Sequence, residues 1–142
     1  MSRAIPFCMI KPILLLFLDP LLQPTDRARI LCLLLLVTLV TAMLYAGSQP
    51  VFQIVIPNPP WDKLAHATAF GGFAALAWVV LGARSSSGAI MVAFVIALMD
   101  EGMQYYTPGR TADVTDIVAD LTGAIMAMLM LRLLKARAAG SL

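Results

Sequence analysis

The stretch ILCLLLLVTLVTAMLYA, residues 30–46, contains no charged residue and decides the class of fold. A helix needs roughly 17–25 mostly apolar residues to cross the hydrocarbon core of a bilayer, which is about 30 Å thick. Three further stretches meet this requirement, at residues 64–82, 88–105 and 114–134. Each is predicted to be helical, because an isolated strand would leave its backbone groups unpaired in lipid. The sequence therefore predicts an all-α membrane protein, a bundle of four transmembrane helices.

Composition excludes the main classes of soluble protein. The chain of 142 residues is 61% hydrophobic and 13% charged, whereas soluble domains are about 45–50% apolar and about 25% charged. Too few polar side chains are present to cover a core of this size, which argues against a soluble enzyme and a nucleic-acid-binding domain. A disordered chain is excluded because disorder requires low hydrophobicity and high net charge.

Small residues let membrane helices approach closely, so we expect such contacts at Gly71, Gly72, Gly102 and Gly123.

The chain divides into an N-terminal segment (1–29), the four-span domain (30–134) and a tail (135–142). The first segment is apolar but interrupted by prolines, so we predict that it lies at the membrane interface. The first span could instead be a cleaved signal peptide. Because Leu44 stands where cleavage requires a small residue, an uncleaved anchor is favoured.

Cys8 and Cys32 lie in apolar stretches and are predicted to be packed thiols, not a disulfide.

The distribution of charge predicts the orientation in the membrane. With four spans, eight of the ten basic residues fall on one side of the bundle. They are Arg3, Lys11, Arg27, Arg29, Arg84, Arg132, Lys135 and Arg137. The positive-inside rule makes this side cytoplasmic, so both termini are predicted to be cytoplasmic. An aromatic belt is predicted at the opposite interface, formed by Tyr45, Trp61, Tyr105 and Tyr106.

Most of the acidic residues fall on the other, outer side. Six of the eight lie near the outer ends of the last three spans. They are Asp62, Asp100, Glu101, Asp113, Asp116 and Asp120. Only Lys63, Arg110 and His66 accompany them as groups that can carry positive charge.

Helical spacing places many of these groups on common faces. Asp62 and His66 are four residues apart, and Glu101 and Gln104 are three apart. Asp113, Asp116 and Asp120 follow one stripe, and Asp120 lies about 9 Å below the start of its helix. A carboxylate at that depth must face the bundle and find a partner. We therefore predict a polar cavity that opens outward between the second, third and fourth spans, with the uncharged first span toward lipid.

Structural roles compete with this interpretation. Asp62 and Asp113 could stabilise helix N-termini, His66 could be a packed histidine, and Asp100 could face lipid headgroups. The acids could also form a salt-bridge network with Arg110. His66 with the carboxylates would suit a hard cation better than zinc, but we predict no metal site and no cofactor.

Two segments and their layout resemble a known family. DKLAHATAF (62–70) and DEGMQYYTPGRTADVTDIVADLTG (100–123), within four spans, are similar to VanZ-like proteins. These bacterial membrane proteins are named for a member that gives resistance to the glycopeptide teicoplanin. The family pattern falls on Asp62, Lys63, His66, Glu101, Gln104, Pro108, Gly109, Arg110, Asp113 and Asp116. This chain departs from it at Asp120, where many members have asparagine, and its proline-rich start is an elaboration outside the core. The resemblance implies action at the outer face of the bacterial cytoplasmic membrane.

Two functional hypotheses follow. In the first, the outer cavity binds a lipid-linked or cell-envelope group. If the protein is an enzyme, it also modifies that group. Arg110 would hold an anion and His66 or Glu101 would transfer protons, with Asp62, Lys63, Gln104, Asp113, Asp116 and Asp120 completing the polar cluster. In the second, the chain is a non-catalytic subunit that docks on a larger membrane complex. Ion or proton transport is a third interpretation, disfavoured because the inner halves of the spans are apolar. The expected partners are membrane lipids, an anionic envelope lipid or a membrane complex, and no nucleic acid.

Overall fold

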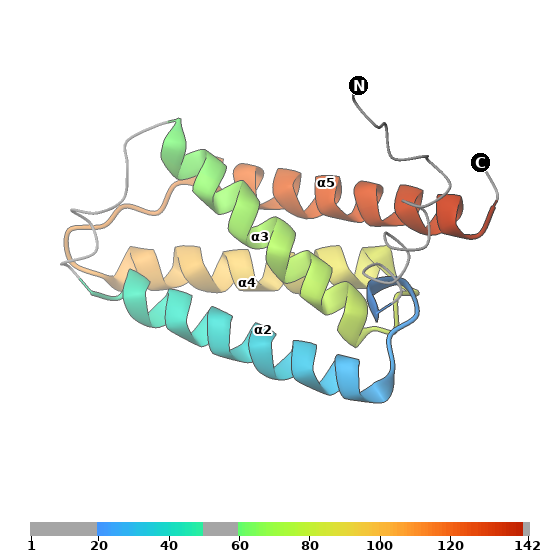
Figure 1. The fold of residues 1–142 in the computed structure, drawn as a ribbon. Helices are drawn as coiled ribbons and strands as arrows, with labels where there is room; N and C mark the ends of the chain where they lie inside the picture. Colours follow the sequence, from blue (N-terminus) through green and yellow to red (C-terminus); the bar gives the residue numbers. More distant parts are fainter. Residues whose placement is uncertain (1–19, 50–59, 141–142) are drawn as a thin grey trace, which may run out of the picture.

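The computed structural model describes residues 20–49 and 60–140, which form a bundle of antiparallel helices (Figure 1). These are α2 (Asp26–Gly47), α3 (Trp61–Val80), α4 (Ser86–Tyr106) and α5 (Val114–Ala138). Each is long and apolar enough to cross a membrane. The predicted all-α transmembrane bundle is therefore confirmed. The interfacial segment predicted before it falls largely outside the described residues.

Side-chain caps define where three helices begin. The Thr25 hydroxyl accepts a hydrogen bond from the backbone N–H of Ala28 (3.3 Å), so α2 starts four residues before its uncharged stretch. Ser85 caps α4 in the same way, through the N–H of Gly88 (3.0 Å). Asp113 caps α5, so its expected role at a helix N-terminus is confirmed.

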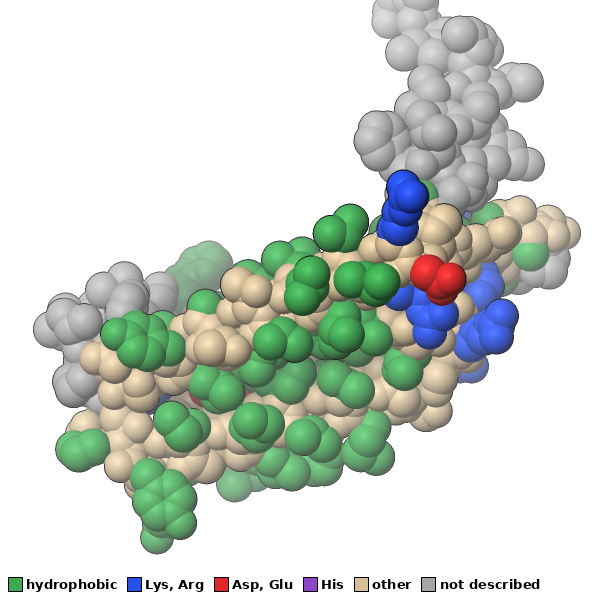
Figure 2. Space-filling view, turned by 90° about the horizontal axis from the view of Figure 1, so that it is seen from below, with side chains coloured by type: hydrophobic (Ala, Val, Ile, Leu, Met, Phe, Trp, Pro, Cys, Tyr) green, Lys and Arg blue, Asp and Glu red, His purple; other side chains and the backbone are tan. Residues whose placement is uncertain are grey.

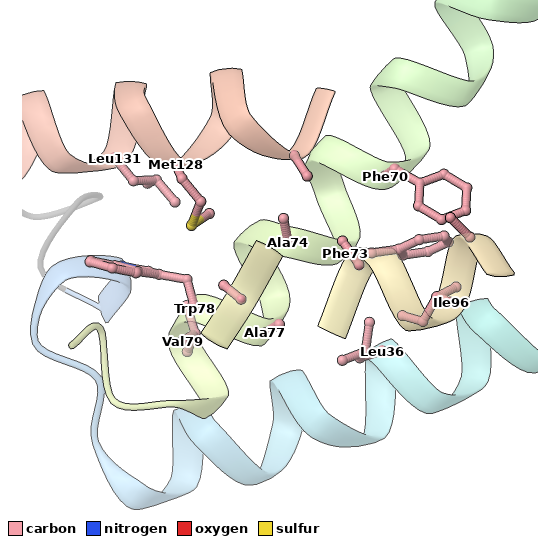
Figure 3. Packing of buried hydrophobic residues seen from close by; sticks show 14 of the residues in the cluster. Leu36, Phe70, Phe73, Ala74, Ala77, Trp78, Val79, Ile96, Met128 and Leu131 are labelled. Atoms are coloured by element: carbon pink, nitrogen blue, oxygen red, sulfur yellow. The ribbon is translucent and has the colours of Figure 1, made fainter. Parts of the chain in front are cut away.

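The core is built around α3, which packs against each of the other three helices. In Figure 1 this helix crosses the bundle diagonally, from the side of α5 at one end to the side of α2 at the other. Its buried side chains include Phe70, Phe73 and Trp78. Trp78 lies near Met128 and Leu131 of α5, whereas the two phenylalanines lie toward the other end of the core (Figure 3).

One end of the bundle carries the basic residues predicted to be cytoplasmic. The helix bounds bring together Arg27, Arg29, Arg84, Arg132, Lys135 and Arg137, and Figure 2 shows Lys and Arg gathered at one end of an otherwise apolar face. Two of them bind backbone carbonyls at the end of α3 and in the turn that follows it. Arg29 Nε donates to Val80 O (3.0 Å) and Lys135 Nζ donates to Ala83 O (2.6 Å). Cations at these carbonyls satisfy acceptors that the helix leaves unpaired.

Close helix approach is confirmed at two of the four glycines and is wrong at the other two. A Cβ on Gly123 of α5 would lie 1.9 Å from the backbone oxygen of Ala67, and one on Gly71 would lie 3.1 Å from the oxygen of Gly123. These two glycines permit the α3–α5 contact. At Gly72 and Gly102 an added Cβ would meet nothing within 4 Å among the described residues. Neither glycine is therefore needed for a close approach of two described helices.

Candidate functional site

The polar residues meet at the end of the bundle opposite the basic residues. This polar end is formed by the end of α2, the start of α3, the end of α4 and the start of α5 (Figure 1). All six acidic residues of the predicted cluster lie there. The four aromatic residues of the predicted belt are at the same end and are exposed. Asp100, Glu101, Gln104, Asp116 and Asp120 are buried, although each is polar or charged.

Lys63 is the centre of an ion-pair network between α3 and α5. Its Nζ donates to Asp113 Oδ2 (3.0 Å) and to Asp116 Oδ1. Asp62 Oδ2 lies 3.7 Å from the same nitrogen. One ammonium therefore balances three carboxylates, and the predicted salt-bridge network is built on Lys63 and not on Arg110.

His66 lies one turn further along α3 and faces two carboxylates of α5. Its Nδ1 is 3.0 Å from Asp120 Oδ1, and its Nε2 is 3.8 Å from Asp116 Oδ2. The Asp120 side chain is only 1% exposed. An ionised carboxylate only accepts hydrogen bonds, so when Asp120 is ionised the proton of this contact lies on Nδ1 of His66. Asp120 thus has the partner that its depth requires.

Glu101 and Asp113 join the end of α4 to the start of α5. Glu101 Oε2 accepts a hydrogen bond from the backbone N–H of Asp113 (2.8 Å). The Asp113 carboxylate accepts in turn from the hydroxyl (2.6 Å) and the N–H (2.9 Å) of Thr115. These bonds, with Lys63, hold the pKa of the Asp113 carboxyl well below its ordinary value. Glu101 therefore holds the loop before α5 through Oε2, and its role in proton transfer stays a prediction.

Gln104 pairs with Asp100 and not with Glu101. Its Nε2 donates to Asp100 Oδ2 (3.0 Å) inside the bundle. Asp100 is 5% exposed, so the interpretation that it faces lipid headgroups is wrong. The position of Asp100 near the end of its helix did not indicate that it is buried, because a residue there can face the bundle interior or the headgroups.

Arg110 follows a turn in which Gly109 has a φ of +82°. Glycine adopts this backbone conformation without strain. The guanidinium returns over the polar end, where its Nη1 donates to Gly47 O (3.2 Å) at the end of α2. Among the described residues Arg110 has no carboxylate within ion-pair distance. Of its five N–H donors, only the one bound to Gly47 O has a hydrogen-bond partner in the part of the chain that the structure describes.

A cavity of about 280 Å³ connects these charged groups to an apolar wall. It is lined by Met43, Ala46, Gly47, Asp62, Ala65, His66, Ala69, Phe70, Asp100 and Arg110. It lies between α2, α3 and α4, whereas the sequence predicted a cavity among the last three spans. The α5 carboxylates instead point to Lys63 and His66 and hold α3 against α5.

The wall contributed by α2 was missed, because uncharged residues such as Met43 and Gly47 carry no sequence signal of a site. Among residues 20–49 and 60–140 no three His, Cys, Asp or Glu side chains are placed to hold a metal ion.

Comparison with known proteins supports the resemblance in the two polar segments. The family described as VanZ/LLP1 matches residues 10–135. This match starts well before residue 30, so part of the N-terminal segment that was expected to lie outside the family core falls within it. No curated protein and no solved structure matches the chain. The match covers most of the sequence and both polar segments, and the chain belongs to the VanZ/LLP1 family.

Proposed function

We propose that this VanZ-like membrane protein binds an anionic, lipid-linked or cell-envelope group in the cavity between α2, α3 and α4. In this proposal the polar end faces outward from the bacterial cytoplasmic membrane and both termini are cytoplasmic. Binding of the group would link the protein to glycopeptide resistance, as the family resemblance to the teicoplanin-resistance protein implies.

The state of Arg110 carries the proposal. The other strong cation at the polar end, Lys63, is already bound by aspartates. Arg110 lines the cavity and makes one hydrogen bond to a neutral carbonyl among the described residues. A guanidinium held over a cavity without a carboxylate partner is suited to a phosphate or carboxylate of a ligand, which it can bind through two parallel N–H bonds.

His66 is the residue best placed to transfer a proton to such a ligand. It lines the cavity, and buried Asp120 orients its ring through Nδ1. His66 Nε2 lies 3.8 Å from Asp116 Oδ2. A reaction would require this nitrogen to face the ligand instead of Asp116. Binding is therefore the core of the proposal, and catalysis is an extension that depends on His66.

The second candidate is a non-catalytic subunit of a larger membrane complex. The Lys63 network favours it, because Asp113 and Asp116 join α3 to the start of α5 and do not line the cavity. In that case Arg110 would only close the end of α2 through the Gly47 carbonyl.

Exchange of Arg110 separates the two candidates. Arg110→Lys keeps the charge and can still bind Gly47 O, but it loses the bidentate geometry. If the cavity binds an anion, this variant keeps the wild-type melting temperature in detergent and increases teicoplanin sensitivity. Arg84→Lys, at an exposed position of the basic end, is the matched control and should change neither. A stable Arg110→Lys variant with wild-type teicoplanin sensitivity would contradict the proposal.

A further inference from the structure

A second cavity continues from the first along α2 and α3. Its volume is about 520 Å³, and the two cavities share Met43 and Ala69. Leu39 of α2 and Gly72 and Leu76 of α3 extend the lining toward the middle of the bundle. Ala69 and Leu76 are seven residues apart, so this part of the groove is about 10 Å long. An apolar groove thus leads away from the charged groups along the helix axes.

Gly72 keeps the groove open. A Cβ at this position would meet nothing within 4 Å in the part of the chain that the structure describes, in contrast to Gly71 on the adjacent face of the same helix. The small residues on this side of α3 therefore leave space between α2 and α3. Both helices are long and apolar enough to span a membrane. In that setting hydrocarbon is the material that fills an apolar groove at the surface of the bundle.

The charges at the head of the groove are mixed. Arg110 contributes a guanidinium, whereas Asp62 and Asp100 contribute carboxylates. A Cβ placed on Gly47 would lie 3.6 Å from Arg110 Nη1 and 3.5 Å from Asp100 Oδ1. The guanidinium and the carboxylate therefore both lie next to Gly47 at the end of α2. Asp62 Oδ1 is buried and has no hydrogen-bond partner among the described residues. Arg110 complements the anionic part of a headgroup, and a headgroup that also carries an ammonium complements the two carboxylates as well.

We infer that the bound group is a phospholipid with a phosphate and a primary amine in its headgroup, and with one hydrocarbon chain in the α2–α3 groove. Arg110 binds the phosphate, Asp62 and Asp100 receive the amine, and the chain runs past Ala69 and Gly72. This inference rests on the proposed binding function and specifies the class of ligand.

The test uses the full chain, purified in detergent and stripped of lipid, and follows its melting temperature as short-chain phospholipids are added. The probes are dihexanoyl phosphatidylethanolamine, phosphatidylglycerol and phosphatidylcholine, together with free phosphoethanolamine, which has no chain. A ligand that binds only the folded state raises the melting temperature. We expect phosphatidylethanolamine to bind at least about ten-fold more tightly than the other three, because they lack either the amine contacts or the chain.

Groove and headgroup variants assign the contacts. Gly72→Leu places a side chain in the groove and should weaken phosphatidylethanolamine binding about ten-fold or more. Gly102→Leu on α4 is the matched control, because an added Cβ there also meets open space, and it should bind as wild type. Asp100→Asn keeps an oxygen for Gln104 Nε2 and should abolish the preference for phosphatidylethanolamine over phosphatidylcholine. If Gly72→Leu does not fold, Ala69→Leu blocks the groove at its junction with the first cavity.

The remaining outcomes distinguish this inference from the function on which it rests. Equal affinity for all three phospholipids would overturn the headgroup assignment. Unchanged affinity in both folded groove variants would overturn the chain position. If Arg110→Gln weakens phosphoethanolamine binding while the groove variants bind phosphatidylethanolamine as wild type, the anion site stands and the lipid inference fails. If Arg110→Gln binds every probe as wild type, both proposals fail.

Discussion

At the scale of single residues, Lys63 is the group on which the fold of the polar end depends most. It neutralises Asp113 and Asp116, and the Asp116 side chain is 11% exposed. Lys63→Met should lower the free energy of unfolding by about 2–4 kcal/mol, because a buried carboxylate then loses its partner. Thermal or denaturant unfolding in detergent measures this loss. Adding Asp116→Asn to Lys63→Met should recover part of it. A double variant no more stable than Lys63→Met would show that the lysine acts by packing and not by charge.

Asp113 should make stability depend on pH in the acidic range. Its pKa is lowered from an ordinary value of 3.8 by Thr115 and Lys63. The ionised form therefore contributes stability above pH 3.8 that is lost as the pH falls toward the lowered pKa. Asp113→Asn keeps one side-chain oxygen that can cap α5 but removes the charge and the second acceptor oxygen. Its melting temperature should be below wild type at pH 7, and the two should converge below about pH 3.8. A difference that stays constant over this range would mean that the charge has no part in it.

At the scale of helices, the sequence predicted what depends on local composition and not what depends on packing. The apolar stretches predicted all four spans because the length needed to cross a bilayer is a property of each stretch alone. The clustering of the acids followed from the order of the spans. Which carboxylate meets Lys63 and which meets His66 depends on how α3 crosses α5, and no periodicity encodes that crossing. The cavity wall on α2 was missed for the same reason.

The crossing of α3 and α5 depends on Gly123. Because a Cβ there would lie 1.9 Å from the Ala67 oxygen, Gly123→Ala forces the two backbones apart. Separation would also stretch the Lys63 and His66 contacts, so the loss should exceed about 2 kcal/mol, although alanine favours helix. Gly102→Ala, where open space surrounds the new methyl group, should be neutral or slightly stabilising. Melting temperatures of the two variants in the same detergent make the comparison. Equal stabilities would show that the helices are free to separate at this point.

At the scale of the whole molecule, the two ends of the bundle differ in charge. One end carries Arg and Lys side chains, some of which bind carbonyls at the end of α3 and in the turn after it. The other end holds buried carboxylates and exposed aromatic rings. Between them the helices are covered with exposed leucine, valine and methionine, as a surface against lipid requires. We therefore expect one orientation, with the basic end on the cytoplasmic side, because positively charged loops tend to stay there during insertion.

This orientation can be measured with an impermeant thiol reagent in intact cells. The background replaces Cys8 and Cys32 with alanine, so that a single introduced cysteine is labelled. Thr111 precedes α5 at the polar end and Ser87 lies in the first turn of α4 at the basic end, and both are exposed. Thr111→Cys should be labelled in intact cells, whereas Ser87→Cys should be labelled only after the membrane is permeabilised. The reverse pattern would place the cavity and Arg110 in the cytoplasm. An envelope ligand could then reach the site only from the inner leaflet, and the proposed function would have to be replaced by one acting on cytoplasmic groups.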